Sequence, residues 1–237
     1  HLSIRRQRQM CIRDRASTIT PIPLTQVQQI NRSMAVSSSG LIAVAGEYNE
    51  ILIFQNSKLI KRMSHKASAI WYMGFGADGK TLISIDDQKT VSSWNINEPE
   101  PKPKQLTKSN EKINALSVSP REAVFAVGKE TGEITLLDFN GTQIRTWAAG
   151  EAINALAYNN AGDRLASGDE GGVLKIWNTT TGLLKDYQKE HRARINHVTF
   201  SKDDSMVASA GFDRVVRIWN AKNLNEIPIV LDDHNDW

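Results

Sequence analysis

Apolar and polar residues alternate over short runs along most of the chain. In INALSV, residues 113–118, the apolar positions include Ile113, Leu116 and Val118, so the alternation slips once after the first residue. The run INHVTF at 195–200 repeats this pattern, and turn segments such as NNAG or KDDS follow. We interpret Asp203 and Asp204 of KDDS as plain turn residues. Period-two alternation between turns predicts short antiparallel strands.

The strand pattern recurs in frames of constant length. Four frames, 70–94, 113–137, 153–177 and 195–219, each advance 24 positions from an isoleucine to a Trp or Leu. Their starts lie 43, 40 and 42 residues apart, so length varies only between the frames. A fourth candidate strand lies in these connections, for example at 143–146 or 183–187. Four short strands in about forty residues are typical of one blade of a β-propeller.

Two segments carry a family resemblance: LASGDEGGVLKIWN at 165–178 and VASAGFDRVVRIWN at 207–220. With them the chain resembles the WD-repeat family, also called WD40, from residue 31 to residue 237. The resemblance implies an all-β fold, a WD40-type β-propeller. The implied propeller has clear blades near 70–95, 113–138, 153–178 and 195–220, and partial copies of the repeat near 31–54 and at 233–237.

Rings in this family usually close with about seven blades, and closure removes exposed sheet edges. The resemblance therefore implies an incomplete propeller over the repeat region, 19–237. We expect a fragment of a longer multidomain protein, for which a bacterial source is one option. Residues 1–18 form a basic arm that fits no period, and we expect this arm to be disordered or non-native.

Composition limits the classes of function. Of 237 residues, 40% are hydrophobic and 23% charged, enough to bury a core. The net charge is +3, but residues 1–20 carry +4 and the remainder −1, so no nucleic-acid partner is expected. No apolar run approaches the ~18 residues of a membrane helix. The one cysteine, Cys11, excludes an internal disulfide. We expect a cytoplasmic protein without cofactor, and without metal, because the five histidines lack ligand spacing.

The WD-repeat family often ties each blade with a hydrogen-bonded set of His, Ser, Asp and Trp. One frame matches this set fully, which implies a structural role for His191, Ser209, Asp213 and Trp219. The set decays elsewhere; Ala149, for example, stands at a histidine position. Ser, His and Asp together could also suggest a hydrolase triad, but no nucleophile-elbow pattern accompanies them. We therefore expect no enzyme activity.

Loops at one end of a propeller usually bind partners. Here they include Arg192, Arg194, Phe212 and Arg214, which suit an acidic or phosphorylated protein or peptide. An ordinary solvated loop is the alternative. Trp71 stands where three other frames have Asn, so it is either a contact residue or a repacked one. We expect a non-catalytic scaffold for protein–protein interactions. The alternative is a regulatory or sensor propeller of a larger signalling protein with a separate catalytic domain.

Overall fold

The computed structural model describes residues 31–47, 49–67 and 69–232, and every regular element in these ranges is a β-strand. The strands form five four-stranded antiparallel sheets, in each of which neighbours in the chain are neighbours in the sheet. The expected all-β propeller fold is confirmed. The basic arm at 1–18 and the repeat opening at 233–237 lie outside the described residues.

The strands group into sheets as follows. The first sheet holds β1 (Asn31–Val36), β2 (Ile42–Gly46), β3 (Glu50–Gln55) and β4 (Lys58–Ser64). The second holds β5 (Ile70–Phe75), β6 (Thr81–Asp86), β7 (Thr90–Asn95) and β8 (Lys104–Lys108). The third holds β9 (Ile113–Val118), β10 (Val124–Lys129), β11 (Glu133–Asp138) and β12 (Gln143–Ala148). The fourth holds β13 (Ile153–Tyr158), β14 (Arg164–Asp169), β15 (Leu174–Asn178) and β16 (Leu184–Gln188). The fifth holds β17 (Ile195–Phe200), β18 (Met206–Gly211), β19 (Val216–Asn220) and β20 (Ile229–Leu231).

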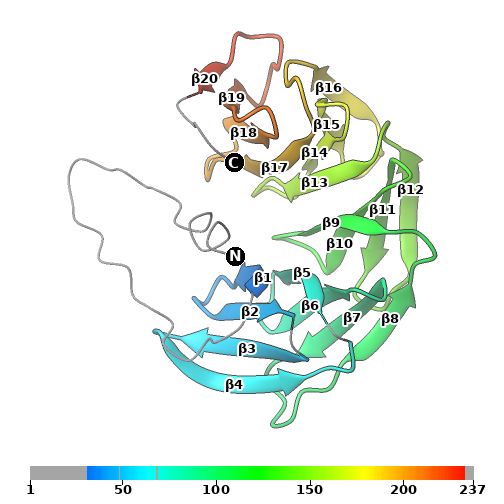
Figure 1. Ribbon diagram of the computed structural model, residues 1–237, viewed down its shortest axis with the longest axis vertical. Helices are drawn as coiled ribbons and strands as arrows, with labels where there is room; N and C mark the ends of the chain where they lie inside the picture. Colours follow the sequence, from blue (N-terminus) through cyan, green and yellow to red (C-terminus); the bar gives the residue numbers. More distant parts are fainter. Residues whose placement is uncertain (1–30, 48, 68, 233–237) are drawn as a thin grey trace.

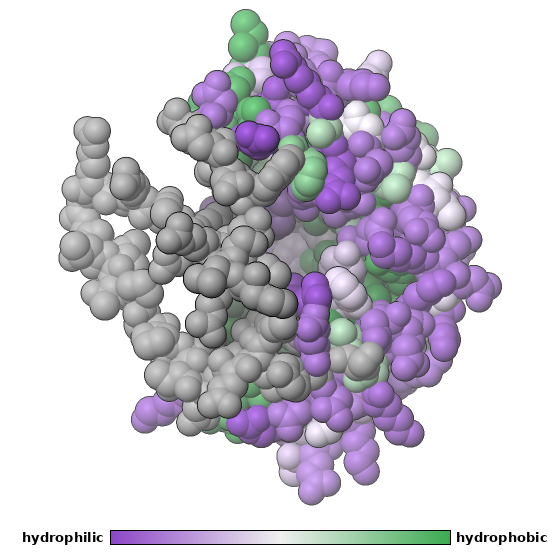
Figure 2. Space-filling model, viewed as in Figure 1, coloured by the Kyte–Doolittle hydropathy of each residue, from purple (hydrophilic) through white to green (hydrophobic). Residues whose placement is uncertain are grey.

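The five sheets lie in an arc like the blades of a propeller (Figure 1). The first strand of each sheet lies toward the centre and the fourth strand lies on the outside. Among the described residues the arc stays open between the first and fifth sheets (Figure 1). Hydrophilic residues predominate over the described part of the face shown in Figure 2.

The first sheet is more regular than its sequence indicates. The segment 31–54 reads as a partial copy, but it supplies three strands of a complete sheet, and β4 completes it. The slip in the alternation also has a structural cause. A register shift follows the first residue of β5, β9, β13 and β17, where a β-bulge turns the next side chain to the other face.

Neighbouring sheets pack closely because small residues line the contact. A Cβ added to Gly128 would lie 2.5 Å from Cγ2 of Ile153 in the next sheet. Gly168 meets Ile195 in the same way one sheet further on, and both isoleucines are fully buried. The close approach therefore requires glycine at these two positions, and it locks one blade against the next.

Candidate functional site

The four residues of the implied hydrogen-bonded set lie together in the fifth sheet. His191, ahead of β17, places Nε2 2.8 Å from Oγ of Ser209 on β18 and Nδ1 2.9 Å from Oδ1 of Asp213. Trp219 on β19 donates its indole N–H to the same Ser209 hydroxyl at 2.9 Å. The chain of contacts joins the loop before β17, the β18–β19 turn and two strands, so it holds these elements in one arrangement.

Arg217 is a further member that the sequence reading missed. Its Nη1 lies 3.0 Å from Nδ1 of His191 and 3.1 Å from Oδ2 of Asp213, and the residue is buried. Alternation along β19 places it on the same face as Trp219, two residues away, and this spacing could have revealed it. A buried arginine needs a carboxylate partner, and Asp213 is that partner for Arg217.

The burial and the pKa shifts of this set indicate a structural role rather than a catalytic one. Burial lowers the pKa of His191; the adjacent Arg217 charge adds to this, while Asp213 opposes it. Burial tends to raise the pKa of Asp213, but its hydrogen bonds with His191 and with backbone N–H groups hold it below its usual value. The Ser209 side chain has no exposed surface, so no substrate can reach its hydroxyl in this arrangement. The geometry is that of a buried hydrogen-bond network that joins the loop, the turn and the two strands.

The Ser–Trp hydrogen bond of this set is also present in the second and fourth sheets, and in the first and third sheets both of its partners are replaced. Equivalent bonds of 2.9 and 2.8 Å join Trp94 to Ser84 and Trp177 to Ser167. In the first and third sheets both positions are apolar and buried. Val44 and Val127 stand at the serine position, and Phe54 and Leu137 stand at the tryptophan position. Replacing both partners leaves no buried hydroxyl or N–H without a partner, so these blades lose the bond at little cost.

The fourth sheet replaces the missing His and Asp by another charged contact. Lys175, at the position of Arg217, lies with Nζ 3.2 Å from Oδ2 of Asp169 and also donates to the backbone carbonyl of Ala149. The Asp169 side chain is almost fully buried, and its other oxygen accepts the N–H of Val173. A basic residue on the third strand thus ties the turn to the preceding loop in both sheets.

The predicted partner residues come from two loops that meet. The N–H of Phe212 donates to the carbonyl of Arg194 at 2.8 Å, and the N–H of Arg192 donates to Oδ2 of Asp213 at 3.1 Å. The Arg194 guanidinium lies 4.5 Å from the centre of the Phe212 ring, which stays 40% exposed. Arg214 follows in the same turn with a left-handed φ of 68°. The loops therefore present arginine and phenylalanine side chains from one end of the fifth sheet.

Acidic residues occupy the position of Phe212 in the three preceding sheets. They are Asp87, Glu130 and Glu170, all exposed. In all four sheets the backbone N–H at this position donates to the carbonyl of the residue just before the inner strand. This repeat position is therefore acidic in the second to fourth sheets, whereas in the fifth sheet it is aromatic and lies next to arginines.

The inner strands border a hollow of about 450 Å³ on the same side. Its lining includes Asn114, Asn154 and Asn196 at equivalent positions of successive inner strands. Asn154 donates to Oε2 of Glu170 at 2.7 Å. Trp71 holds the equivalent position on β5, is 41% exposed, and has the Arg32 guanidinium 4.6 Å from its ring centre. Trp71 is thus a surface residue rather than a repacked core residue.

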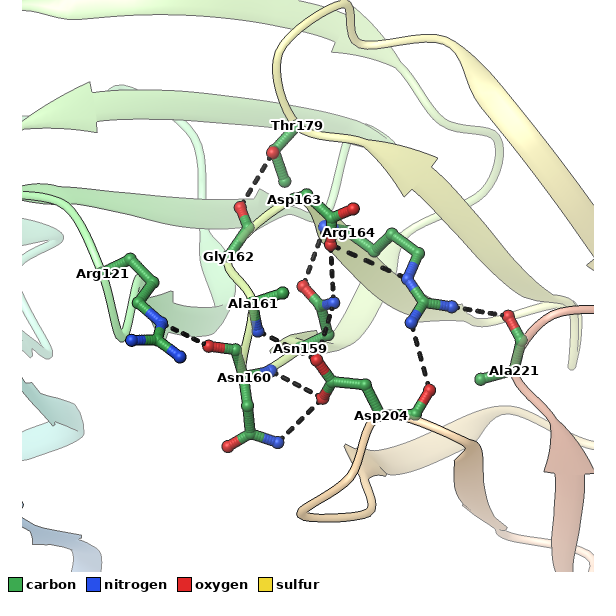
Figure 3. Close-up of polar contacts among 10 residues, drawn as sticks. All are labelled: Arg121, Asn159, Asn160, Ala161, Gly162, Asp163, Arg164, Thr179, Asp204 and Ala221. Carbon is green, nitrogen blue, oxygen red and sulfur yellow. Dashed lines mark hydrogen bonds and ion pairs between the residues drawn. The ribbon is translucent and has the colours of Figure 1, made fainter.

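The opposite ends of the strands carry a network that the sequence reading did not anticipate (Figure 3). Asp204, in the β17–β18 turn, reaches into the β13–β14 turn of the neighbouring sheet. Its carboxylate accepts N–H groups from the backbone of Asn160 and Ala161, at 2.7 and 2.9 Å, and from the side chains of Asn160 and Asn159, at 2.8 and 3.0 Å. Partial burial tends to raise the pKa of Asp204, but these donors hold it below its usual value. Asp204 is therefore a clamp between sheets rather than a plain turn residue.

The same network extends on both sides of the clamp. Arg164 of the fourth sheet donates to the backbone carbonyls of Ala221 and Asp204, at 2.8 and 3.1 Å, and so forms a second link to the fifth sheet. Arg121, in the β9–β10 turn, donates to the carbonyl of Asn160 at 2.9 Å (Figure 3). The turns of three successive sheets are thus linked at this end. Asp203, by contrast, bonds only within its own turn, to Ser201 and Ser205.

The described residues include no cluster of three or more His, Cys, Asp or Glu side chains placed to hold a metal ion. Nor does any helix long and apolar enough to span a membrane occur in the described part of the chain.

Comparison with known proteins adds a family match. Residues 141–178 and 183–220 match the family described as WD domain, G-beta repeat. Each match runs from the outer strand of one sheet through three strands of the next, so a sequence repeat straddles two sheets.

Curated relatives are similar over larger parts of the chain. Target of rapamycin complex subunit LST8 of Mus musculus is 22% identical over 215 residues, which cover 84% of this chain and 65% of the relative. WD repeat and SOCS box-containing protein 1 of Danio rerio is 24% identical over 184 residues, 70% and 43% of the two chains. Polyadenylation factor subunit 2 of Candida albicans is 29% identical over 117 residues, 48% and 21%. The chain spans less than two thirds of the length of each of these relatives.

Proposed function

The chain is a WD-repeat protein, and from this premise we propose that it is a non-catalytic scaffold that binds a protein partner through the loops of its fifth sheet. The binding surface consists of Arg192, Arg194, Phe212 and Arg214, with Trp71 as a further contact on the same rim. The contacts of Asp213 with His191, with the N–H of Arg192 and with Arg217 hold the two loops that carry the arginines and Phe212 in place. A rigid support of this kind lowers the ordering cost of binding.

The observation that carries the proposal is the Arg194–Phe212 pair. An exposed phenylalanine under a guanidinium forms a flat surface with apolar and cationic character, a composition found at interface hot spots. Arginine grips a carboxylate or phosphate with two parallel hydrogen bonds. The partner segment that contacts this surface is therefore acidic or phosphorylated.

The names of the relatives support a role in an assembly. Two of them are named as subunits, one of a target of rapamycin complex and one of a polyadenylation factor. By analogy this chain holds components of a larger assembly together, with a different set of partners set by its own loops. The single cysteine in the sequence suits a reducing compartment, so we place this role in the cytoplasm.

The test is partner capture with a matched control. The full-length protein and a Phe212→Ala, Arg214→Ala double variant are used as bait in affinity purification, together with a Lys202→Ala, Lys222→Ala variant. The two lysines are exposed and lie in turns next to the Asp204 clamp, at the other end of the strands. All three proteins should have the same melting temperature. The first variant should lose partners that the lysine variant retains; an identical partner list for all three would contradict the proposed surface.

A further inference from the structure

A pocket of about 460 Å³ lies between the second and third sheets, beside Trp71. Its floor is formed by Ile85 and Ile113, which are buried, and its aromatic wall by Trp71 and Tyr72. The charged residues around its rim are Asp86, Asp87, Lys89, Lys112 and Glu130. The volume falls in the range of pockets that enclose small molecules or single large side chains.

Departures from the repeat build this pocket. Tyr72 on β5 pairs across the sheet with Ile85 on β6. The equivalent pairs in the third and fourth sheets are small, Ala115 with Gly128 and Ala155 with Gly168. In those sheets the small pair lets an isoleucine of the next sheet pack directly against the backbone.

The bulky Tyr72–Ile85 pair leaves no room for the same approach by Ile113. Accordingly, β5 contacts β9 less extensively than β9 contacts β13 or β13 contacts β17. The pocket therefore lies where the second sheet carries large residues at positions that hold Ala and Gly in the third and fourth sheets. Its aromatic wall has the same origin, since Trp71 stands where β9, β13 and β17 have asparagine.

The lining of the pocket suits a planar cation. Aromatic rings attract a cation to their faces, and carboxylates at the rim can bind the N–H groups of a guanidinium. The structure already contains such a contact, because the guanidinium of Arg32 lies 4.6 Å from the Trp71 ring centre. Arg32 and Trp71 line a separate hollow that all five inner strands border. Arg32 does not line the pocket described here, so Trp71 borders both.

The rim carries a net negative charge. Three carboxylates face two lysines, and Nζ of Lys89 donates to the carbonyl of Asn110 at 2.7 Å. We propose that the pocket receives an arginine side chain of the partner protein, with the guanidinium against Trp71 and Tyr72 and near Asp87 and Glu130. This assignment rests on the proposed scaffold function, and it gives the partner a basic anchor in addition to its acidic segment.

Direct binding of a small probe tests the assignment without any knowledge of the partner. The full chain is titrated with acetyl-arginine amide, acetyl-citrulline amide and the amide of Nα-acetyl-lysine, and bound fractions are measured by saturation-transfer NMR. Citrulline keeps the shape of arginine but has no charge. The arginine probe should bind at least about tenfold more tightly than citrulline, and more tightly than the lysine probe, which lacks the planar group.

Variants localise the binding. Trp71→Asn introduces the residue found at this position in the third to fifth sheets and should weaken arginine binding by about three- to thirtyfold. Glu130→Gln removes one rim carboxylate from an exposed position and should weaken it by a smaller factor, about threefold. Glu170→Gln, at the same repeat position one sheet further on and outside the pocket, is the control and should bind as the unchanged protein does.

Equal binding of arginine and citrulline would overturn the assignment, as would equal loss in the Glu130 and Glu170 variants or unchanged binding after Trp71→Asn. Melting temperatures identify any variant that fails to fold, and the exposed Glu130 site keeps the test decisive in that case. Partner capture separates the two ideas. If the arginine probe fails while the Phe212→Ala, Arg214→Ala variant still loses partners, only the pocket assignment is wrong.

Discussion

Replacing Asp204 by Asn should destabilise the protein more than the same change at its neighbour Asp203. Asn keeps the size of Asp and tolerates the left-handed φ of 59° at this position. It removes the charge and one acceptor oxygen that together serve four N–H donors in the next sheet. Each hydrogen bond to a charged group contributes ~1.5–3 kcal/mol when the pair is shielded from water.

The expected loss is smaller than four such bonds. Asn160 and Ala161 are exposed, so water can bond their freed N–H groups. Asn159 is fully buried but also donates to Asp163 at 2.7 Å. With this discount we expect a loss of about 1–2 kcal/mol in the free energy of unfolding. For a chain of this size that lowers the melting temperature by roughly 2–8 °C.

Urea unfolding of Asp204→Asn, Asp203→Asn and the unchanged protein measures the difference. Asp203 is exposed and bonds only to serines of its own turn, so its replacement should shift the midpoint much less. The slope of the transition should stay constant, because the surface exposed on unfolding does not change. Equal midpoints for the two variants would refute the inter-sheet clamp.

Three further outcomes follow from the packing and the buried charges. Asp213→Ala should cost about 2–4 kcal/mol in urea unfolding, because it leaves the buried Arg217 without its carboxylate; a loss no larger than that of Asp203→Ala would contradict this role. Gly168→Ala should cost about 1–3 kcal/mol, because the new methyl group meets Ile195, and unchanged thermal stability would contradict the close packing. Burial lowers the pKa of His191 below 6.5, so the unfolded chain binds its proton more readily. Stability from this group is complete above pH 6.5 and is lost as the pH falls through the folded value; the melting temperature should therefore decline from pH 7 to pH 5, and by less in a His191→Gln variant.

Much of the fold could be predicted from the sequence because each blade repeats one pattern of burial. The isoleucine that opens a frame is buried in the second to fifth sheets, and in all four the alternation slips at a register shift directly after it. The first sheet looked partial because its frame is one residue shorter, and because Val44 and Phe54 replace the Ser and Trp that mark the other blades. Apolar substitution keeps the packing while removing the motif, so a motif underestimates the number of blades.

Contacts between repeats could not be predicted in the same way. Asp204 reads as a turn residue, since its donors lie more than forty positions away in the chain and only the stacking of the sheets brings them near. Arg217 differs from Asp204, because its contacts with His191 and Asp213 lie within one sheet and the alternation along β19 could have revealed it. The pocket beside Trp71 arises from the looser packing between the second and third sheets, which depends on two blades rather than on either sequence repeat.

Binding of a protein partner at one loop face of the arc should slow backbone exchange there. Hydrogen exchange of the protein alone and in complex with a captured partner measures this. We expect slower exchange on binding in the loops at 189–194 and 211–215 and around Trp71, with the Asp204 turn unchanged. Protection confined to the outer strands β16 and β20, or to the turns of the Asp204 clamp, would contradict it.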